Sequence, residues 1–229
     1  MKLIFAILFL YLSTAFSQDS SGSQSKPTFR MNGKANLTSN YVEKGLTQTA
    51  GDPGLQADFW FNFGSQFRMG LWAANVNYEN NAGTHFWLKL NADIRVDFTN
   101  TSNLIIKYSD NHYFKSNNRD GNTIGVHLDF SGYKVLYEID NNWQGTRAAA
   151  TYAGLGKDFP IWTNWIWANQ FGYTIPEADG VKAFFDIRSG LGKKLKDIFT
   201  MATLTYTNAT GSFKEQGELA AFVNVSVEY

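Results

Sequence analysis

Hydrophobic and polar residues alternate almost without interruption between His85 and Phe98. The apolar set is Phe86, Leu88, Leu90, Ala92, Ile94, Val96 and Phe98, and the polar set is His85, Lys89, Asn91, Asp93, Arg95 and Asp97. Trp87 is the one residue that breaks the polar set. Because successive side chains of a β-strand point to opposite faces, this run predicts a long strand with one apolar and one polar face.

Similar segments fill the mature chain. About twelve of them can be counted, at residues 34–46, 54–64, 67–78, 85–98, 102–110, 122–131, 133–141, 144–155, 162–175, 180–189, 198–208 and 217–229. Their length suits membrane strands of about 9–11 tilted residues. We therefore predict an all-β fold, an antiparallel up-and-down transmembrane β-barrel with apolar side chains facing lipid and polar ones facing the lumen. Segments 144–155 and 198–208 alternate less clearly, so ten or eight strands stay open as alternatives.

The connections between these segments predict a topology. With a periplasmic N-terminus, the external connections would be 47–53, 79–84, 111–121, 142–143, 176–179 and 209–216. The periplasmic turns would be 65–66, 99–101, 132, 156–161 and 190–197. Single-chain outer-membrane barrels have short periplasmic turns and longer external loops, and most of these lengths agree. The long 190–197 connection is the exception.

The N-terminal residues predict export. Lys2 precedes an apolar run from Leu3 to Leu12, and Ala15-Phe16-Ser17 offers a small-x-small cleavage pattern, so we predict a signal peptide at 1–17. The run is too short to span a bilayer as a helix, which needs about 20 residues. Residues 18–32 would form a flexible leader and 33–229 the barrel domain. The predicted location is the bacterial outer membrane, with membrane lipids as partners.

The last strand predicts how the barrel is assembled. Its apolar face ends at the last residue of the chain and consists of Val223, Val225, Val227 and Tyr229. Such a terminal strand resembles the signal that the barrel-assembly machinery recognises by adding it to an exposed strand edge. We therefore expect that machinery to be a partner.

Composition and charge exclude several classes of function. Twenty Lys and Arg balance twenty Asp and Glu, and no basic block or stripe occurs, so nucleic acid is not an expected partner. Cysteine is absent, which excludes disulfides, thiolate catalysis and zinc–thiolate sites. The chain is 44% hydrophobic yet has a mean hydropathy of −0.29, as lumen-facing polar residues of a barrel would produce.

One region carries a family resemblance. Residues 37–49, Leu-Thr-Ser-Asn-Tyr-Val-Glu-Lys-Gly-Leu-Thr-Gln-Thr, together with 53–57 and 69–76, resemble the TorF-type porin family of small Gram-negative outer-membrane proteins. The resemblance is close over the first three predicted strands and general elsewhere. It implies a β-barrel and a porin role, and it implies no catalytic residues. Lys44 occupies a position where the family often has Arg. This is a small change if the residue only supplies a positive charge to the lumen, and a larger one if it forms bidentate hydrogen bonds.

Polar faces supply the candidate lumen residues, which are Arg68, Lys89, Asp93, Arg95, Asp97, Asp129, Lys134, Glu138 and Arg188. Opposite charges in a narrow interior favour paired ladders over an ion-selective ring. About eight strands leave a filled lumen and about sixteen a water channel, so twelve predicts either a largely plugged barrel or a narrow solute path. The candidates for a constriction or plug are Arg68, Lys89, Asp93 and Arg95, because the alternation of side chains places them on the lumen face.

An outer-membrane lipid-modifying enzyme is the alternative function. Such chemistry needs a nucleophile, a base and an orienting group within hydrogen-bond reach. The three histidines, His85, His112 and His127, have no Gly-x-Ser-x-Gly partner motif and no metal-ligand spacing. We therefore predict no catalytic, metal or cofactor site.

A broad aromatic face predicts self-association. It consists of Phe59, Phe61, Phe63, Phe67, Met69 and Leu71, which also suit simple lipid contact. Association inside a bilayer depends on close packing and lipid release, and closed cyclic symmetry is usual. A homo-oligomer with a central hole would enclose lipid, because lipid-facing surfaces would line that hole.

Overall fold

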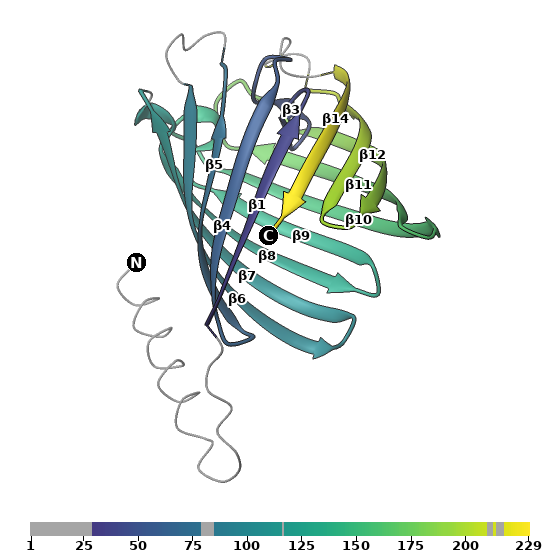
Figure 1. Ribbon diagram of the computed structural model, residues 1–229. Helices are drawn as coiled ribbons and strands as arrows, with labels where there is room; N and C mark the ends of the chain where they lie inside the picture. The colour runs from purple at the N-terminus through teal and green to yellow at the C-terminus, as the bar shows by residue number, and fades with distance from the viewer. Residues whose placement is uncertain (1–28, 79–84, 116, 210–212, 214–217) are drawn as a thin grey trace, which may run out of the picture.

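The computed structural model describes residues 29–78, 85–115, 117–209, 213 and 218–229, and in them twelve antiparallel strands close into one barrel (Figure 1). The wall strands are β1 (Phe29–Thr38), β4 (Gly54–Phe63), β5 (Phe67–Asn75), β6 (Phe86–Thr99), β7 (Ser102–Phe114), β8 (Gly121–Phe130), β9 (Tyr133–Asp140), β10 (Ala150–Trp162), β11 (Trp165–Pro176), β12 (Phe184–Leu195), β13 (Ile198–Thr207) and β14 (Glu218–Glu228). Each strand pairs with its neighbour in sequence, and β1 closes the barrel on β14. The predicted count of twelve is confirmed.

Four short elements lie outside the wall. They are β2 (Val42–Glu43), β3 (Leu46–Thr47) and the 3₁₀ turns η1 (Asn117–Arg119) and η2 (Trp143–Gly145). Among the described residues, no helix has the length and apolar character needed to cross a membrane. The predicted signal peptide and most of the predicted leader lie outside the described residues.

The outer face of the wall is apolar, as lipid contact requires. Along β9, for example, Tyr133, Val135, Tyr137 and Ile139 are exposed, while the alternate residues are only partly so. The face predicted for lipid or oligomer contact lies on the neighbouring strands β4 and β5, where Phe59 pairs with Leu71 and Phe61 with Met69. Self-association through this face stays a prediction.

The first and last wall strands close the barrel side by side, with β1 next to β14 in Figure 1. Gly33 and Tyr229 exchange two backbone hydrogen bonds, of 2.9 and 3.0 Å, and Lys34 pairs with Glu228 at 3.4 Å. The Tyr229 ring covers Gly33, where any Cβ would overlap it. The last residue is therefore part of the closure.

β1 begins at Phe29, before the predicted barrel start at residue 33. Phe29 packs against Phe61 and Phe63 of β4, with ring centroids 5.8 and 5.6 Å apart. This aromatic cluster extends the strand into the predicted leader. The predicted strand 34–46 is wrong at its other end, because β1 stops at Thr38 and the chain then turns into the lumen.

Two predicted periplasmic turns, 156–161 and 190–197, lie largely inside β10 and β12. Glycines often mark turns, but Gly190 and Gly192 face inward and leave room for Thr203 and Phe199 of the next strand. The observed turns are at 163–164 and 196–197, where Asn164 and Lys196 adopt positive φ angles. The strands predicted at 144–155 and 180–189 are therefore wrong at both ends, because β10 runs from Ala150 to Trp162 and β12 from Phe184 to Leu195.

The register of β6 makes a matched pair of substitutions informative. Ile94 pairs with Phe67 and Ile106 on the apolar face, whereas Arg95 faces inward and pairs with Asp97 at 2.7 Å. An Arg near the bilayer midplane on the lipid face costs roughly 2–4 kcal/mol. We expect Ile94→Arg to lower the amount of assembled barrel much more than Arg95→Ile. Heat-modifiable gel mobility of membrane fractions measures this, and equal yields of both variants would contradict the assigned faces.

Candidate functional site

Residues 39–53, here called the inserted segment, connect β1 to β4 through a small hairpin. In it, Val42 pairs with Thr47 and Glu43 with Leu46, leaving Lys44 and Gly45 as a two-residue turn. Both turn residues have positive φ, 49° and 79°, as a type I′ hairpin turn requires. Glycine is also required by space, because a Cβ on Gly45 would lie 2.6 Å from the Asp186 Cβ.

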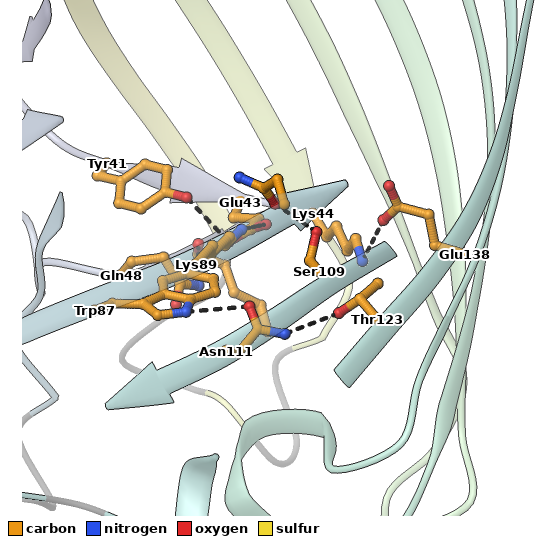
Figure 2. A network of polar contacts seen from close by, with 12 residues as sticks. Tyr41, Glu43, Lys44, Gln48, Trp87, Lys89, Ser109, Asn111, Thr123 and Glu138 are labelled. Carbon is orange, nitrogen blue, oxygen red and sulfur yellow. Dashed lines mark hydrogen bonds and ion pairs between the residues drawn. The ribbon is translucent and has the colours of Figure 1, made fainter. Parts of the chain in front are cut away.

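The hairpin lies inside the barrel. It contacts inward side chains of β6, β9 and β12, strands that lie on different sides of the wall. These contacts join Glu43 to Lys89, Lys44 to Glu138, and the Val42 carbonyl to Arg188. A segment that reaches all three strands must cross the lumen, as the close view in Figure 2 shows for β6 and β9.

Two ion pairs hold the turn of the hairpin. The Lys44 Nζ lies 2.6 Å from the Glu138 Oε2, and the Lys89 Nζ lies 3.1 Å from the Glu43 Oε1 (Figure 2). All four side chains are less than one third exposed. Removing one partner of such a buried pair leaves an uncompensated charge, so each pair resists displacement of the hairpin.

Aromatic side chains surround the Lys89 ammonium group. It lies 3.9 Å from the centre of the Trp87 ring and 4.5 Å from that of Trp72. Tyr41 of the inserted segment packs near both indoles and donates a hydrogen bond of 3.0 Å to Glu43. Cation–π contacts of this kind strengthen when they are desolvated, so the wall of β5 and β6 holds the lysine in place.

The returning half of the inserted segment is fixed by a buried amide. Gln48 donates to the Leu46 carbonyl at 3.0 Å and accepts a hydrogen bond of 2.7 Å from the Tyr78 hydroxyl. Leu46 packs in a buried cluster with Trp143 and Phe184. The hairpin is thus anchored by packing as well as by charge.

The charged groups of the turn are tuned by their surroundings. Burial alone raises the pKa of Glu43, but the ammonium groups of Lys89 and Lys44 outweigh burial and hold the pKa below its ordinary value of 4.5. Burial alone lowers the pKa of Lys44, but the carboxylates of Glu138 and Glu43 outweigh it and raise the pKa above its ordinary value. Both groups are therefore charged at neutral pH.

These shifts predict a pH dependence. Because the pKa of Glu43 is lower in the folded state, its contribution is complete above its ordinary value of 4.5 and is lost as pH falls through the lowered value. We expect the hairpin to stay in place from neutral pH down to that region and to loosen below it. Single-channel current recorded against pH tests this. A current that rises between neutral pH and the ordinary Glu43 value would contradict it.

Two cavities of the lumen lie beside the hairpin. The larger, of about 270 Å³, lies against the wall from β4 to β9 and is lined by Glu43, Lys44, Lys89 and Glu138 among others. The smaller, of about 140 Å³, lies against β1, β4 and β12 to β14, and it shares Tyr41 and Gln56 with the larger. A solute that crosses the barrel must pass beside the hairpin.

The structure places the predicted lumen residues in two groups. Lys89, Glu138 and Arg188 contact the hairpin. The others lie toward the turn ends of their strands and form ion pairs there: Arg68 with Asp93 at 2.6 Å, Arg95 with Asp97 at 2.7 Å, and Lys134 with Asp158 at 2.7 Å. Asp129 lies opposite Lys134 in the β8–β9 register. Of the four candidates for a constriction, Lys89 is the one that the inserted segment contacts.

Val42, Glu43 and Lys44 are not among the predicted site residues, because the predicted strand 34–46 places them in the wall. One signal could have found them. The alternation of β1 stops at Thr38, and Lys44-Gly45 offers a two-residue turn between Glu43 and Leu46.

The histidines take part in other contacts. His127 lies 2.8 Å from the Glu138 Oε1, and His112 lies in β7, which extends to Phe114, and not in the external connection predicted at 111–121. His112 contacts Asp110 at 3.2 Å and Asp120 at 3.7 Å. In the part of the chain that the structure describes, no cluster of three His, Asp or Glu side chains could hold a metal ion.

Comparison with known proteins shows the fold. No family model and no curated protein matches this chain. The chain is similar to the solved NanC porin, with 10% identity, a TM-score of 0.60, and coverage of 87% of this chain and 99% of that one. The corresponding values for the KdgM porin are 7%, 0.52, 88% and 98%, and those for the Acinetobacter baumannii outer membrane protein Omp33 are 8%, 0.50, 88% and 98%. The barrel therefore has the fold of outer-membrane porins, and the TorF-type resemblance stays a prediction.

Proposed function

We propose that this protein is a porin-like barrel of the bacterial outer membrane in which the hairpin of residues 42–47 leaves a narrow path for small polar solutes. One observation carries the proposal: the hairpin crosses the lumen and is held on ion pairs, and two cavities lie beside it. A barrel of twelve strands is intermediate between the filled barrels of about eight strands and the open channels of about sixteen. An inserted segment is what sets the width of its path.

The charges of the lumen support weak ion selectivity. Cations and carboxylates alternate in pairs along the inner wall, as in Arg68 with Asp93 and Lys134 with Asp158. Paired charges of opposite sign cancel each other's field at a distance, whereas selective filters use rings of one sign. Size and polarity of the solute would then decide its passage more than its charge does.

A plugged barrel with a structural role is the second candidate, and the two ion pairs of the hairpin favour it. A lipid-modifying enzyme is the remaining alternative. It would need a nucleophile beside His85, His112 or His127, and the contacts of His112 and His127 are with carboxylates.

Single-channel recording in planar bilayers tests the proposed function. The purified protein, shown to be folded by heat-modifiable gel mobility, should give small, uniform current steps with little preference between cations and anions. The absence of current steps from folded protein would overturn the proposal and leave the plugged barrel.

A further inference from the structure

The wall strand β14 has a short free edge at its seam with β1. Tyr229 and Val223 of β14 both form backbone hydrogen bonds across this seam to β1 and the residue after it. Because every second residue of an antiparallel strand turns its backbone groups to the same side, Ala221 and Leu219 face the same seam. β1 ends at Thr38, however, and the chain then enters the lumen. The last stretch of the seam therefore has β14 on one side and no wall strand on the other.

The residue that a longer β1 would place opposite Ala221 is used elsewhere. In the β1–β14 register that residue is Tyr41, whose amide donates to the Thr49 Oγ1 at 3.1 Å and whose carbonyl accepts from the Gln48 amide at 2.6 Å. Within the described part of the chain, no hydrogen bond reaches the backbone of Ala221 or Leu219 from the seam side. Both residues are exposed, Leu219 at 72%. The edge therefore presents backbone N–H and C=O groups that lack partners.

A hollow of about 440 Å³ on the lipid-facing surface begins at this edge, where Ala221 lines it. From there it follows one row of the register, in which Val223 pairs with Ala202, Ala202 with Leu191, and Leu191 with Trp167. The small side chain of Ala202 leaves space between its larger neighbours. The hollow thus runs across the strands from β14 to β11. A peptide strand added to β14 would run along it, whereas an acyl chain can lie across.

The outward hydroxyl groups of the hollow already have partners. The Ser189 hydroxyl accepts a hydrogen bond of 3.0 Å from the Trp167 Nε1 and donates one of 2.8 Å to the Asn169 Oδ1. The Ser39 hydroxyl accepts one of 3.0 Å from the Val223 amide. The body of the hollow therefore suits an apolar chain, and the β14 edge at its end suits a polar group.

The position of the hollow and the chemistry of the edge together define the ligand. No water is available in the hydrocarbon region, so backbone groups that face lipid need another partner. The edge offers both donors and acceptors. An ester of a phospholipid only accepts, whereas an amide with a neighbouring hydroxyl group both donates and accepts. Lipid A, the acylated part of lipopolysaccharide, has amide-linked hydroxyacyl chains, and the edge lies at the end of the barrel that the predicted topology places in the outer leaflet.

We propose that the hollow binds one acyl chain of lipid A, with the amide and hydroxyl groups of its linkage on the free edge of β14. The chain lies over Ala202, and the linkage meets the backbone of Ala221 and Leu219. One bound lipid then covers the part of the seam that β1 leaves. This proposal goes beyond the proposed function, because it needs the barrel to lie in the outer membrane but does not need the lumen to conduct.

Two alanines on the outer face of the wall form a matched test. Ala202→Phe fills the hollow, and Ala153→Phe adds the same ring to another exposed alanine, on β10, that does not line it. Ala221→Pro removes one N–H from the free edge and no hydrogen bond to β13, because that amide faces the seam. The probe is purified lipid A, added stepwise to folded protein in detergent, with phosphatidylglycerol for comparison. Native mass spectrometry counts the bound lipids, and heat-modifiable gel mobility shows that each variant is folded.

We expect one lipid A to bind each wild-type barrel saturably, in preference to phosphatidylglycerol. Ala202→Phe should abolish this binding, Ala221→Pro should weaken it about fivefold, and Ala153→Phe should leave it unchanged. No saturable binding, equal losses in both phenylalanine variants, or equal binding of phosphatidylglycerol would each overturn the proposal. Dimers that Ala202→Phe abolishes would overturn it in favour of a second copy in the hollow. Because no current is measured, a barrel that binds lipid A but does not conduct would refute only the porin function.

Discussion

Replacing Val42–Thr47 by a short Gly-Ser link is expected to raise single-channel conductance several-fold. The wall strands stay intact, because β1 already ends at Thr38 and β4 begins at Gly54. What is lost is the segment that crosses the lumen, with its ion pairs to Lys89 and Glu138. Planar-bilayer recording of folded protein measures the change.

The control for this variant is a Gly-Ser replacement of residues 177–180 in the connection between β11 and β12, which leaves Val181 packed against the cluster of Leu46. That connection lies at the same end of the barrel, and it carries none of the ion pairs of the hairpin. Conductance should stay near that of the wild type. If both replacements raise conductance equally, or neither does, the hairpin does not set the width of the path.

Deleting Val227–Tyr229 is expected to abolish assembly of the barrel and leave exported protein in the periplasm. Val227 pairs with Ala35 on one side and with Ile198 on the other, and Tyr229 exchanges two hydrogen bonds with Gly33. The deletion therefore opens the seam between β1 and β14 and exposes backbone groups that a bilayer cannot satisfy.

Cell fractionation followed by heat-modifiable gel mobility measures this effect. Tyr229→Phe is the control, because it keeps the aromatic ring over Gly33 and the backbone contacts. That variant should assemble normally. Wild-type levels of the truncated protein in the outer membrane would show that the terminal strand is not the assembly signal.

Side-chain alternation was enough to predict the wall of the barrel. It located β6 to within one residue and gave the count of twelve, because a lipid-facing surface imposes apolar residues at every second position. Alternation could not distinguish glycines that make a turn from glycines that make room. Gly190 and Gly192 lie inside β12 because Thr203 and Phe199 need the space beside them, which is a property of the neighbouring strand.

The site was harder to predict for a related reason. The alternation of side chains assigns Lys89, Glu138 and Arg188 to the lumen, but it does not show which residues they contact there. Their common partner is the hairpin, and nothing in the local sequence from Tyr41 to Leu46 requires it to leave the wall. Lys44-Gly45 indicates a turn, but only the fold brings Lys44 to β9 and Gly45 against Asp186.

The central claim, that the hairpin crosses the lumen, is tested most directly by a cross-link. The chain has no cysteine, and the side chains of Lys44 in the hairpin and Glu138 on β9 meet at 2.6 Å, so cysteines at these two positions lie within reach of a short bifunctional thiol reagent. In outer membranes treated with such a reagent, Lys44→Cys with Glu138→Cys should form an intramolecular cross-link, seen as a shift in gel mobility. Lys44→Cys with Lys134→Cys, four residues along the same face of β9, should not. Cross-linking of both pairs, or of neither, would contradict a hairpin held across the lumen.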